Sequence, residues 1–545
     1  MNIYQTYALL VIGIIILGLI VNVVVTIVDK RKLINHIHTL WRNKKPIENF
    51  IRPNSRFDYQ FKLKRDQHNN LIDDKTCSDL NMEEIFHRSN FNFTAIGEMR
   101  WFATLRNMFK VNNKQLLDQF NNDETFRVNA SYHLASIGKV VYPIFPDQLK
   151  AIKRNNLFMI CPFLPFIGLI ICFISPSTGV LITLFSILLN IVLSGTLKRT
   201  YDQDLKSLFY TAKVLKEGYH LDQIKGTPEV NTNFSHFKGA RLFSGLLGKV
   251  GDQDIGGAFI MLLKMAFMVD YFLFHIIQHT YYRYQDEVMA CYDYVSILDN
   301  HYSLAMYRRT LDTYCEPTAF SNEQTLTFTN LIHPLLENAV PNDLDINHNI
   351  LLTGSNASGK STFMKAVAIN LILAQTIETA TADAFSYRPG LVYTSMANAD
   401  DVLSGDSYFM AELKSIRRLF DIETHMPVYC FIDEIFKGTN TTERIAASES
   451  VLSYLNHQPE YRIVAATHDI ELSELLKDNY QNYHFNETIE NDEIHFDYKI
   501  KKGKRIREMQ LNCCELLTSL TKSTKEPRIR LKIWINIVSC KTLSI

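Results

Sequence analysis

The hydrophobic pattern of the chain begins with 22 uncharged, mostly apolar residues, 7–28. A helix of this length can cross a hydrocarbon core of about 30 Å. No small-residue cleavage site follows the run, so it predicts an uncleaved transmembrane anchor rather than a signal peptide. Basic residues follow at once, beginning with Lys30-Arg31-Lys32, and by the positive-inside rule they place the rest of the chain in the cytoplasm.

A second apolar block, residues 157–194, is interrupted at Ser175-Pro176-Ser177. It predicts a transmembrane hairpin with arms 157–174 and 178–194, and two prolines should kink the first arm. A buried hairpin in a soluble core is the alternative. A third apolar run, 255–277, contains charged residues that would be costly in lipid, so it predicts a buried helix of a soluble region.

The pattern outside these segments changes from helical to alternating along the chain. Residues 200–320 have helical periodicity with few turn signals. Near Gln324, a strand-like stretch begins a series of strands and helices that continues to about Gly503, as expected of an α/β nucleotide-binding domain. The sequence predicts six segments. They are an anchor (1–32), a helical segment (33–156), the hairpin (157–194), a second helical region (195–323), an α/β domain (324–504) and a tail (505–545).

A phosphate-binding loop is predicted between a short apolar strand, Ile350–Leu352, and a helix that starts near Phe363. Its Gly-x-x-x-x-Gly-Lys-Ser pattern lets backbone N–H groups face a polyphosphate at a helix N-terminus. Lys360 would reach the β- and γ-phosphates, and the Ser361 hydroxyl would bind Mg²⁺. The candidate ATP-binding residues of this loop are Gly354, Ser355, Asn356, Ala357, Ser358, Gly359, Lys360, Ser361 and Thr362.

Two later strands end in residues suited to ATP hydrolysis. The strand 428–432 ends in Asp433-Glu434, where Asp433 would hold Mg²⁺ through water and Glu434 would polarise the attacking water. The strand 462–466 ends in Thr467-His468, and His468 could sense the γ-phosphate. The acidic pair could instead cap a helix, and a lone histidine is often structural. The catalytic candidates are therefore Lys360, Glu434 and His468.

Composition restricts the function only weakly. The 57 basic and 57 acidic residues cancel, so composition alone does not indicate a nucleic-acid binder, although a local basic patch remains compatible with it. The nine cysteines are scattered without zinc-binding spacing, which fits reduced thiols in the cytosol.

Together, these stretches resemble the ATPase domain of the MutS mismatch-repair family over about residues 324–500. The family's Thr-Gly-x-Asn-x-x-Gly-Lys-Ser-Thr is matched from Thr353 to Thr362, and its Asp-Glu-Ile-x-x-Gly-Thr-x-Thr from Asp433 to Thr441. Its Ser-x-Phe-Met-x-Glu element is matched from Ser407 to Glu412, and its Ala-Thr-His from Ala466 to His468.

The resemblance implies an α/β P-loop NTPase domain of the ABC type that works as a dimer with ATP and Mg²⁺. Ser407 and Glu412 of one subunit would form the signature that approaches the γ-phosphate held by the other subunit. Val340 and Asn342 would lie near the adenine. The Gly97-Glu98 stretch and the helical region before the α/β domain resemble the family's core and lever helices.

The chain departs from the family at both ends. A membrane anchor stands where the mismatch-reading domain would be, as in membrane-anchored MutS-like proteins of bacteria, which implies the cytoplasmic membrane. After Gly503, residues 506–515 replace the family's Thr-Arg-Asn-Ala-Ile-x-Leu-Leu helix. One allowed set of codons for them, read in a shifted frame, encodes Thr-Arg-Asn-Ala-Ile-Glu-Leu-Leu-Arg. A frameshift near Arg505 is therefore our hypothesis for the tail, and a genuinely divergent tail is the alternative.

The predicted function is a membrane-tethered, cytosol-facing ATPase dimer, with ATP hydrolysis coupled to mismatched or branched DNA. An ATP-switched clamp on a protein partner at the membrane, without DNA binding, is the alternative. A transporter subunit is disfavoured. Three short spans give little translocation pathway, and the element around Ser407 lacks the transporter Leu-Ser-Gly-Gly-Gln signature.

Overall fold

The computed structural model divides the chain into two compact units. Unit 1 consists of residues 1–63, 89–103 and 113–310, and unit 2 of residues 64–88, 104–112 and 311–545. Residues from the predicted 33–156 segment thus contribute to both units. The structure describes residues 3–44, 71–140, 156–247, 262, 264–320, 326–355, 357–396, 408–420, 422–437, 439–490 and 493–504.

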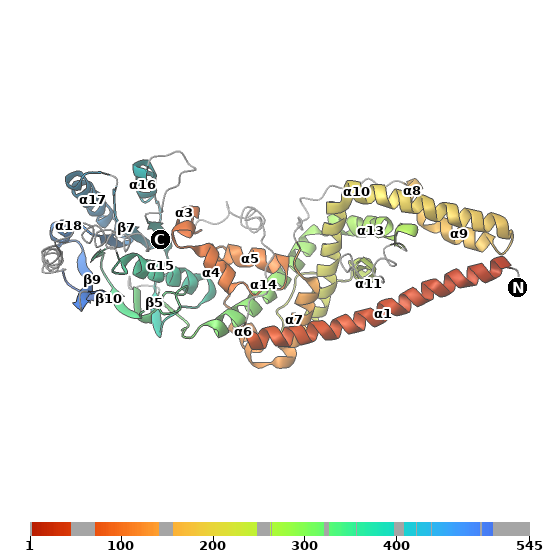
Figure 1. Cartoon of the computed structure of the whole chain (residues 1–545), viewed down its shortest axis with the longest axis horizontal. Coiled ribbons are helices and arrows are strands. Elements are labelled where there is room, and N and C mark those ends of the chain that lie inside the picture. The colour runs from red at the N-terminus through yellow and green to blue at the C-terminus, as the bar shows by residue number, and fades with distance from the viewer. Residues whose placement is uncertain are drawn as a thin grey trace, which may run out of the picture. The chain divides into compact units, whose positions relative to one another are not determined.

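The described part of unit 1 is helical (Figure 1). Its long helices are α1, which contains the predicted anchor, and α10, against which α7, α9, α11, α13 and α14 pack. The helical elements are α1 (Ile3–Asn43), α5 (Ala95–Leu105), α6 (Lys114–Asn122), α7 (Glu124–Ile137), α8 (Asn156–Ile160), η3 (Cys161–Phe163), α9 (Leu164–Ile171), α10 (Pro176–Asp222), α11 (Lys238–Leu247), α13 (Val269–Arg283) and α14 (Gln285–Thr310).

The predicted hairpin is present as two antiparallel arms, with α9 folded back along the first part of α10 (Figure 1). A 3₁₀ turn that contains Pro162 interrupts the first arm at Cys161–Phe163, two residues before Pro165, because proline cannot continue the α-helical hydrogen bonding. The second arm continues well past the predicted end at residue 194, with a kink at Tyr201. Among the described residues, Pro176–Asp202 is the one helical stretch long and apolar enough to cross a membrane.

The helix predicted over 255–277 is not continuous. Within its described part, Met268 adopts a left-handed conformation with φ of 44°, which ends one helical segment before α13 begins at Val269. The α13 side chains Leu273, Phe274 and Ile277 are buried, as the apolar pattern predicted. The break itself had no signal in the sequence, since neither glycine nor proline occurs there.

A buried polar network joins α14 to the start of α5 in unit 1. The Asp299 carboxylate accepts hydrogen bonds from the backbone N–H groups of Phe93 and Thr94 and from the Thr94 hydroxyl, at 2.9, 2.8 and 2.6 Å. The amide of Asn300 donates to the Gly97 carbonyl at 2.7 Å. Burial raises the pKa of Asp299 to about 6, although these donors act against the rise. The predicted Gly97 stretch is therefore packed directly against α14.

Replacing Gly97 with alanine should destabilise unit 1 by at least about 2 kcal/mol, since overpacking a tight site costs roughly 1–3 kcal/mol and displacing a buried acceptor adds to it. A Cβ atom at this position would lie 2.1 Å from Asp299 Oδ2, and three hydrogen bonds hold that carboxylate. The thermal unfolding midpoint measures the effect. Gly195→Ala is the matched control, because its Cβ would approach nothing closer than the Met265 Cε atom at 4.0 Å. Equal midpoints for both variants would contradict the packing argument.

Unit 2 contains two β-sheets with helices around them (Figure 1). The larger sheet has the order β10-β9-β4-β8-β7-β6, parallel except for the β9–β10 hairpin. The smaller sheet has the order β1-β5-β2-β3. The strands are β1 (Thr318–Ala319), β2 (Leu326–Leu331), β3 (Asn342–Ile346), β4 (Ile350–Thr353), β5 (Ala384–Tyr387), β6 (Leu391–Ser395), β7 (Val428–Asp433), β8 (Tyr461–Thr467), β9 (Gln481–Glu490) and β10 (Glu493–Lys502).

The central strands of the larger sheet are apolar on both faces, because helices cover the sheet on both sides. Every residue of β4 and β7 is buried, as are 15 residues of α15. The helices of unit 2 are α3 (Asp74–Asp79), α4 (Met82–Ser89), α15 (Lys360–Ile377), α16 (Tyr408–Arg417), α17 (Thr441–Asn456) and α18 (Ile470–Leu475).

The edge strand β6 is covered by α3, a helix more than 300 residues earlier in the chain. Asp79 accepts hydrogen bonds from the Thr394 hydroxyl and the Met396 N–H at 2.8 and 3.1 Å, and the Thr76 hydroxyl accepts one from the Thr394 N–H at 3.2 Å. These side chains satisfy donors that an unpaired sheet edge would otherwise expose.

Candidate functional site

The three predicted motif strands end at one edge of the larger sheet. Thr353 at the end of β4 is paired with Thr467 at the end of β8, and Asp433 at the end of β7 is paired with Ala466. Because these strands are parallel and adjacent, the residues that follow them come together at their carboxyl ends. In open α/β sheets this edge is where ligands bind.

The loop after β4 is folded around the side chain of Lys360. Its ammonium group donates to the carbonyl oxygens of Gly354 and Ser355 at 2.9 and 2.7 Å, and the residue is 3% exposed. Gly359 precedes α15 with φ of 97°, a conformation that other residues rarely adopt. The Ser358 hydroxyl closes the loop by donating to the Ser355 carbonyl at 2.8 Å. The loop therefore holds a buried cation at the start of a helix.

Two oxygen ligands suited to Mg²⁺ lie side by side next to this loop. The Ser361 hydroxyl donates to the Asp433 carboxylate, with 2.5 Å between the oxygens, so the first turn of α15 touches the end of β7. Hydroxyl and carboxylate oxygens are the hard ligands that Mg²⁺ prefers, and it usually binds through few protein groups together with phosphate oxygens. The pair fits the predicted metal role.

Glu434 lies between a lysine and a histidine. Its carboxylate is 2.6 Å from Lys437 Nζ and 3.3 Å from His468 Nδ1, and the residue is 8% exposed. Its φ of 50° is unusual for glutamate and turns the chain sharply after β7, while its N–H donates to the Ala466 carbonyl at 2.9 Å. Two catalytic candidates from different strands, Glu434 and His468, are thus in contact.

An ion pair supports the end of β8. Arg444 on α17 donates to both oxygens of Asp469, at 2.8 and 2.6 Å, next to His468. Burial lowers the pKa of His468, and Asp469 opposes this while the cations Arg444, Lys360 and Lys437 add to it. The lowered pKa favours the neutral imidazole, which can donate or accept a hydrogen bond with a neighbouring oxygen.

Asn342 joins the two sheets beside the loop. Its amide donates to the carbonyls of Val340 and Tyr498 at 3.2 and 3.0 Å and accepts from the Ile500 N–H at 2.8 Å. Tyr498 has φ of 53° within an irregular stretch of β10, and its ring is 3.0 Å from where a Cβ of Gly359 would lie. Val340, Asn342 and the phosphate-binding loop are therefore neighbours, as a nucleotide that contacts all three would require.

Some predicted residues lie outside the described part of the chain. They are Asn356, Ser407 and the tail from Arg505, so their roles and the frameshift hypothesis remain predictions. Glu412, on α16, accepts a weak hydrogen bond from the Lys437 N–H at 3.4 Å. Ala357 and Thr362 are exposed.

Sequence reasoning missed two charged residues of this site. Glu487 on β9 is 7% exposed and accepts a hydrogen bond from the Ser355 hydroxyl at 2.9 Å, and Lys437 pairs with Glu434. Lys437 is three residues after Glu434, which is a detectable local signal. Glu487 is 132 residues from Ser355, and nothing local distinguishes it from a surface acid on a strand.

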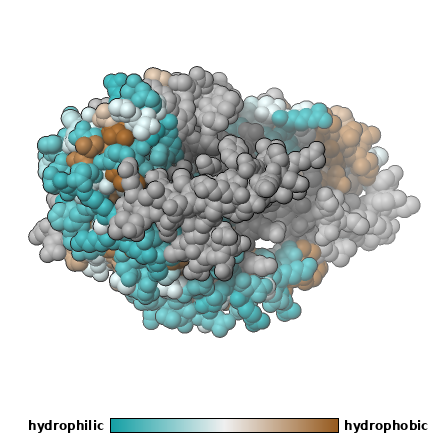
Figure 2. All heavy atoms as spheres, turned by 60° about the vertical axis from the view of Figure 1, so that its left-hand side comes forward, coloured by the Kyte–Doolittle hydropathy of each residue, from teal (hydrophilic) through white to brown (hydrophobic). Residues whose placement is uncertain are grey.

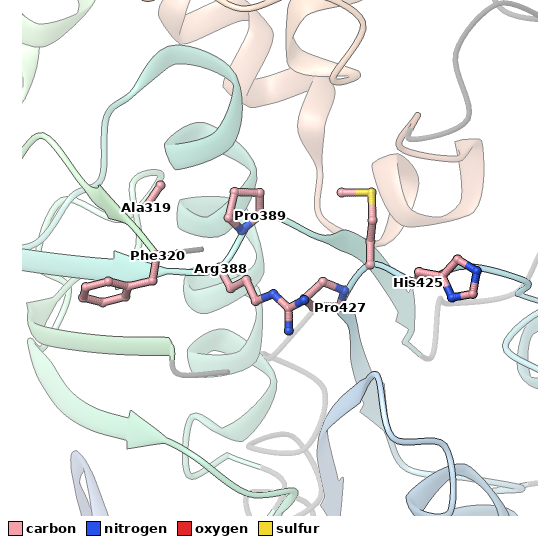
Figure 3. A pocket seen from close by; sticks show the side chains of 7 residues that line it. Ala319, Phe320, Arg388, Pro389, His425 and Pro427 are labelled. Atoms are coloured by element: carbon pink, nitrogen blue, oxygen red, sulfur yellow. The ribbon is translucent and has the colours of Figure 1, made fainter. Parts of the chain in front are cut away.

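A separate pocket lies near the opposite ends of the parallel strands. It has a volume of about 380 Å³ and is lined in part by Phe320, by Arg388 before β6 and by His425 before β7 (Figure 3). Because Arg388 and His425 precede β6 and β7, they lie at the amino ends of these strands. The pocket is therefore not part of the site at the carboxyl ends described above.

Comparison with known proteins supports the MutS family for this part of the chain. Residues 350–526 match the family described as MutS domain V, which covers the three motif strands and the loops after them. The predicted resemblance is thereby confirmed from residue 350 to about residue 500. The family match does not include the apolar segments that are predicted to span a membrane.

Curated relatives show the same partial similarity. The DNA mismatch repair protein MutS of Listeria welshimeri is 33% identical over 215 residues, 36% of this chain and 24% of that protein. MutS of Staphylococcus saprophyticus is 31% identical over 254 residues, 44% of this chain and 28% of that protein. MutS of Pseudothermotoga lettingae is 36% identical over 172 residues, 30% of this chain and 21% of that protein. The chain thus spans about a quarter of the length of the relatives it matches.

Proposed function

We propose that this chain is a membrane-tethered ATPase of the MutS type that binds and hydrolyses ATP with Mg²⁺ as a dimer and couples this cycle to mismatched or branched DNA. The observation that carries the ATPase proposal is the meeting of three chain segments at one sheet edge. Lys360, the Ser361–Asp433 pair and the Glu434–His468 pair follow three adjacent parallel strands. This combination provides phosphate binding, metal binding and a base within one site.

The residues divide the chemistry among them. Lys360 exchanges its two carbonyl partners for phosphate oxygens when the polyphosphate enters the loop. Ser361 and Asp433 would hold Mg²⁺, and the bound ion would supply positive charge against the phosphates. Glu434 orients the attacking water and accepts its proton, and this requires its carboxylate to leave Lys437. His468, whose lowered pKa favours the neutral imidazole, holds the water or the γ-phosphate by a hydrogen bond.

A dimer follows from the proposed trans contact. In the MutS-type arrangement, Ser407 and Glu412 complete the site of a second subunit, so a single subunit holds an incomplete site. The helix α16 presents Met410 and Leu413, both more than a third exposed, which suits a face that contacts another chain.

DNA enters the proposal through the relatives, which are named as DNA mismatch repair proteins. The membrane tether is supported by the apolar stretch 7–28 within α1, by the hairpin of α9 and α10, and by the basic residues that follow both. The predicted location is the bacterial cytoplasmic membrane, with unit 2 in the cytoplasm.

Purified full-length protein in detergent should bind mismatched or branched DNA more tightly than homoduplex DNA of the same length. The affinity should fall steeply as salt rises, because contacts with phosphates release counterions. Adding ATP should change the affinity, and an equal concentration of ADP provides the control. Fluorescence anisotropy across a salt series with the three DNA forms measures all of these effects.

The absence of binding to any of these DNA forms at low salt, with ATP hydrolysis intact, would contradict the DNA part of the proposal. It would favour an ATP-switched clamp on a protein partner. The absence of both DNA binding and ATP hydrolysis would contradict the ATPase proposal itself.

A further inference from the structure

The hairpin of unit 1 has the polarity expected in lipid rather than in water. Large apolar side chains of α10 that are 58–71% exposed point away from the unit: Leu181, Leu184, Phe185, Leu188 and Val192. The polar side chains Thr183, Ser186 and Asn190 on the same helix are instead at most 8% exposed. Apolar residues dominate the visible surface of this region (Figure 2). A water-soluble helix buries its apolar face and exposes its polar face.

Small residues bring the two arms unusually close together. A Cβ atom at Gly168 would lie 2.4 Å from Thr183 Oγ1, and one at Gly179 would lie 2.3 Å from the backbone nitrogen of Cys172. Helices in bilayers gain little from burying apolar side chains against each other, so close backbone contact at small residues stabilises them instead. The packing of the two arms against each other therefore does not require the hydrophobic effect.

The Asn190 amide binds two backbone carbonyl groups that lie beside breaks in the neighbouring helices. Its amide donates to the Cys161 carbonyl at 2.9 Å and to the Ala266 carbonyl at 2.7 Å. Pro165, four residues after Cys161, has no N–H to donate, so the Leu164 N–H bonds the Cys161 carbonyl in a 3₁₀ turn instead. The left-handed Met268 interrupts the helix after Ala266. An unpaired carbonyl costs several kcal/mol in lipid. One buried amide thus adds a hydrogen bond beside each of two helix breaks.

The second of these breaks lies along the apolar part of the hairpin. At about 1.5 Å per residue, Asn190 is about 21 Å along α10 from Pro176, and Lys198 is about 33 Å along it. The distance to Lys198 matches a hydrocarbon core of about 30 Å. If the hairpin turn before Pro176 lies at the headgroups of one leaflet, Lys198 therefore lies at the headgroups of the other. The contacts of Asn190 and of Ser194 with residues 265–266 are then about 6–12 Å inside that level.

We propose that the outward face of α9 and α10 contacts a lipid bilayer, and that the helix break at residues 265–268 enters the cytoplasmic leaflet together with the hairpin. This inference rests on the membrane tether of the proposed function and extends it from two embedded arms to three segments. Cys161, Met268 and Tyr271 form one buried cluster at this place, with Leu193 and Leu197 packed against it. Lys264 and Asp270, 4.0 Å apart on either side of the break, remain near the headgroups with Lys198.

Single tryptophan substitutions in the full-length chain test this arrangement. Phe185→Trp places a reporter on the outward face, Phe267→Trp places one at the break, and Phe274→Trp places a control at a position that is 2% exposed inside unit 1. Each variant is reconstituted in phosphatidylcholine vesicles brominated either near the headgroup or near the chain ends. The emission of the unmodified chain is subtracted.

Phe185→Trp should lose most emission to lipids brominated near the chain ends, since it lies about 14 Å from Pro176 along α10. Phe267→Trp should lose most to lipids brominated near the headgroup, and the Phe274→Trp control should lose little. Quenching of Phe185→Trp alone would overturn the embedded break. If none of the three is quenched, the lipid contact is wrong and a protein, either a second copy or another chain, covers the face.

Flotation of the same vesicles measures whether the chain is attached to the membrane at all, independently of whether the hairpin contacts lipid. A chain that floats without quenching is held by α1 alone, and the tether of the proposed function then stands. ATP hydrolysis by each variant is expected to be unchanged, because none of the three positions belongs to unit 2.

Discussion

Glu434→Gln is expected to lower ATP hydrolysis by about 100-fold or more while ATP binding is retained, since a positioned general base contributes roughly 10²–10⁴-fold. Glutamine preserves the size of the side chain and can still orient a water molecule, but it cannot accept a proton. Glu434 directly follows β7, is 8% exposed and lies 3.3 Å from His468. The other carboxylate near this histidine, Asp469 at 3.7 Å, is already paired with Arg444. Steady-state phosphate release and equilibrium binding of a fluorescent ATP analogue measure the two properties separately.

The control for this variant is Glu449→Gln on α17, the same chemical change at a carboxylate that accepts a hydrogen bond from Ser453. It should leave hydrolysis unchanged. Full turnover in Glu434→Gln would show that another group accepts the proton, whereas loss of ATP binding would show that Glu434 has a structural role.

Lys360→Met should weaken ATP binding by at least about 30-fold, because truncating one partner of a buried charge pair costs about 2–5 kcal/mol. Methionine keeps much of the apolar stem of lysine and removes the charge. In the free protein, Lys360 donates to the Gly354 and Ser355 carbonyls, and its substitution also removes these contacts from the loop. Isothermal titration with ATP and Mg²⁺ measures the affinity, and the thermal unfolding midpoint separates it from any loss of folding.

Lys477→Ala is the control for Lys360→Met. Lys477 is about half exposed and pairs with Glu474 on the surface, so its loss should change neither binding nor the unfolding midpoint measurably. Unchanged ATP affinity in Lys360→Met would exclude a phosphate-binding role for the loop.

The parts of the site that the sequence predicted are those with a local pattern. Short apolar strands followed by a glycine-rich loop, an acidic pair and a histidine were recognisable, and the structure has these strands as β4, β7 and β8. Apolar runs on both faces predicted that the strands were buried, and the parallel pairing then brought their ends together. The hairpin was equally local, because an apolar run and its polar interruption lie within about 40 residues.

Contacts between distant segments could not be predicted in this way. Glu487 reaches Ser355 because β9 pairs with β4, and Asn190 bonds the Ala266 carbonyl beside the helix break at Met268. Neither glutamate nor asparagine is unusual in its local sequence. The predicted start of the α/β domain at residue 324 likewise omitted α3 and residues 104–112, which join unit 2 from far earlier in the chain.

The covering of β6 by α3 has a consequence for biogenesis. A ribosome releases residues 74–79 long before it has made Thr394 and Met396, so during synthesis α3 leaves the ribosome before the strand β6 that it covers exists. Once β6 is made, it can be covered only if the earlier segment is still available within the same polypeptide. A fragment that begins at residue 324 would carry every nucleotide-binding motif and yet expose an uncovered sheet edge, and such edges pair with one another. We expect such a fragment to self-associate, and co-expression of residues 64–112 to keep it in solution.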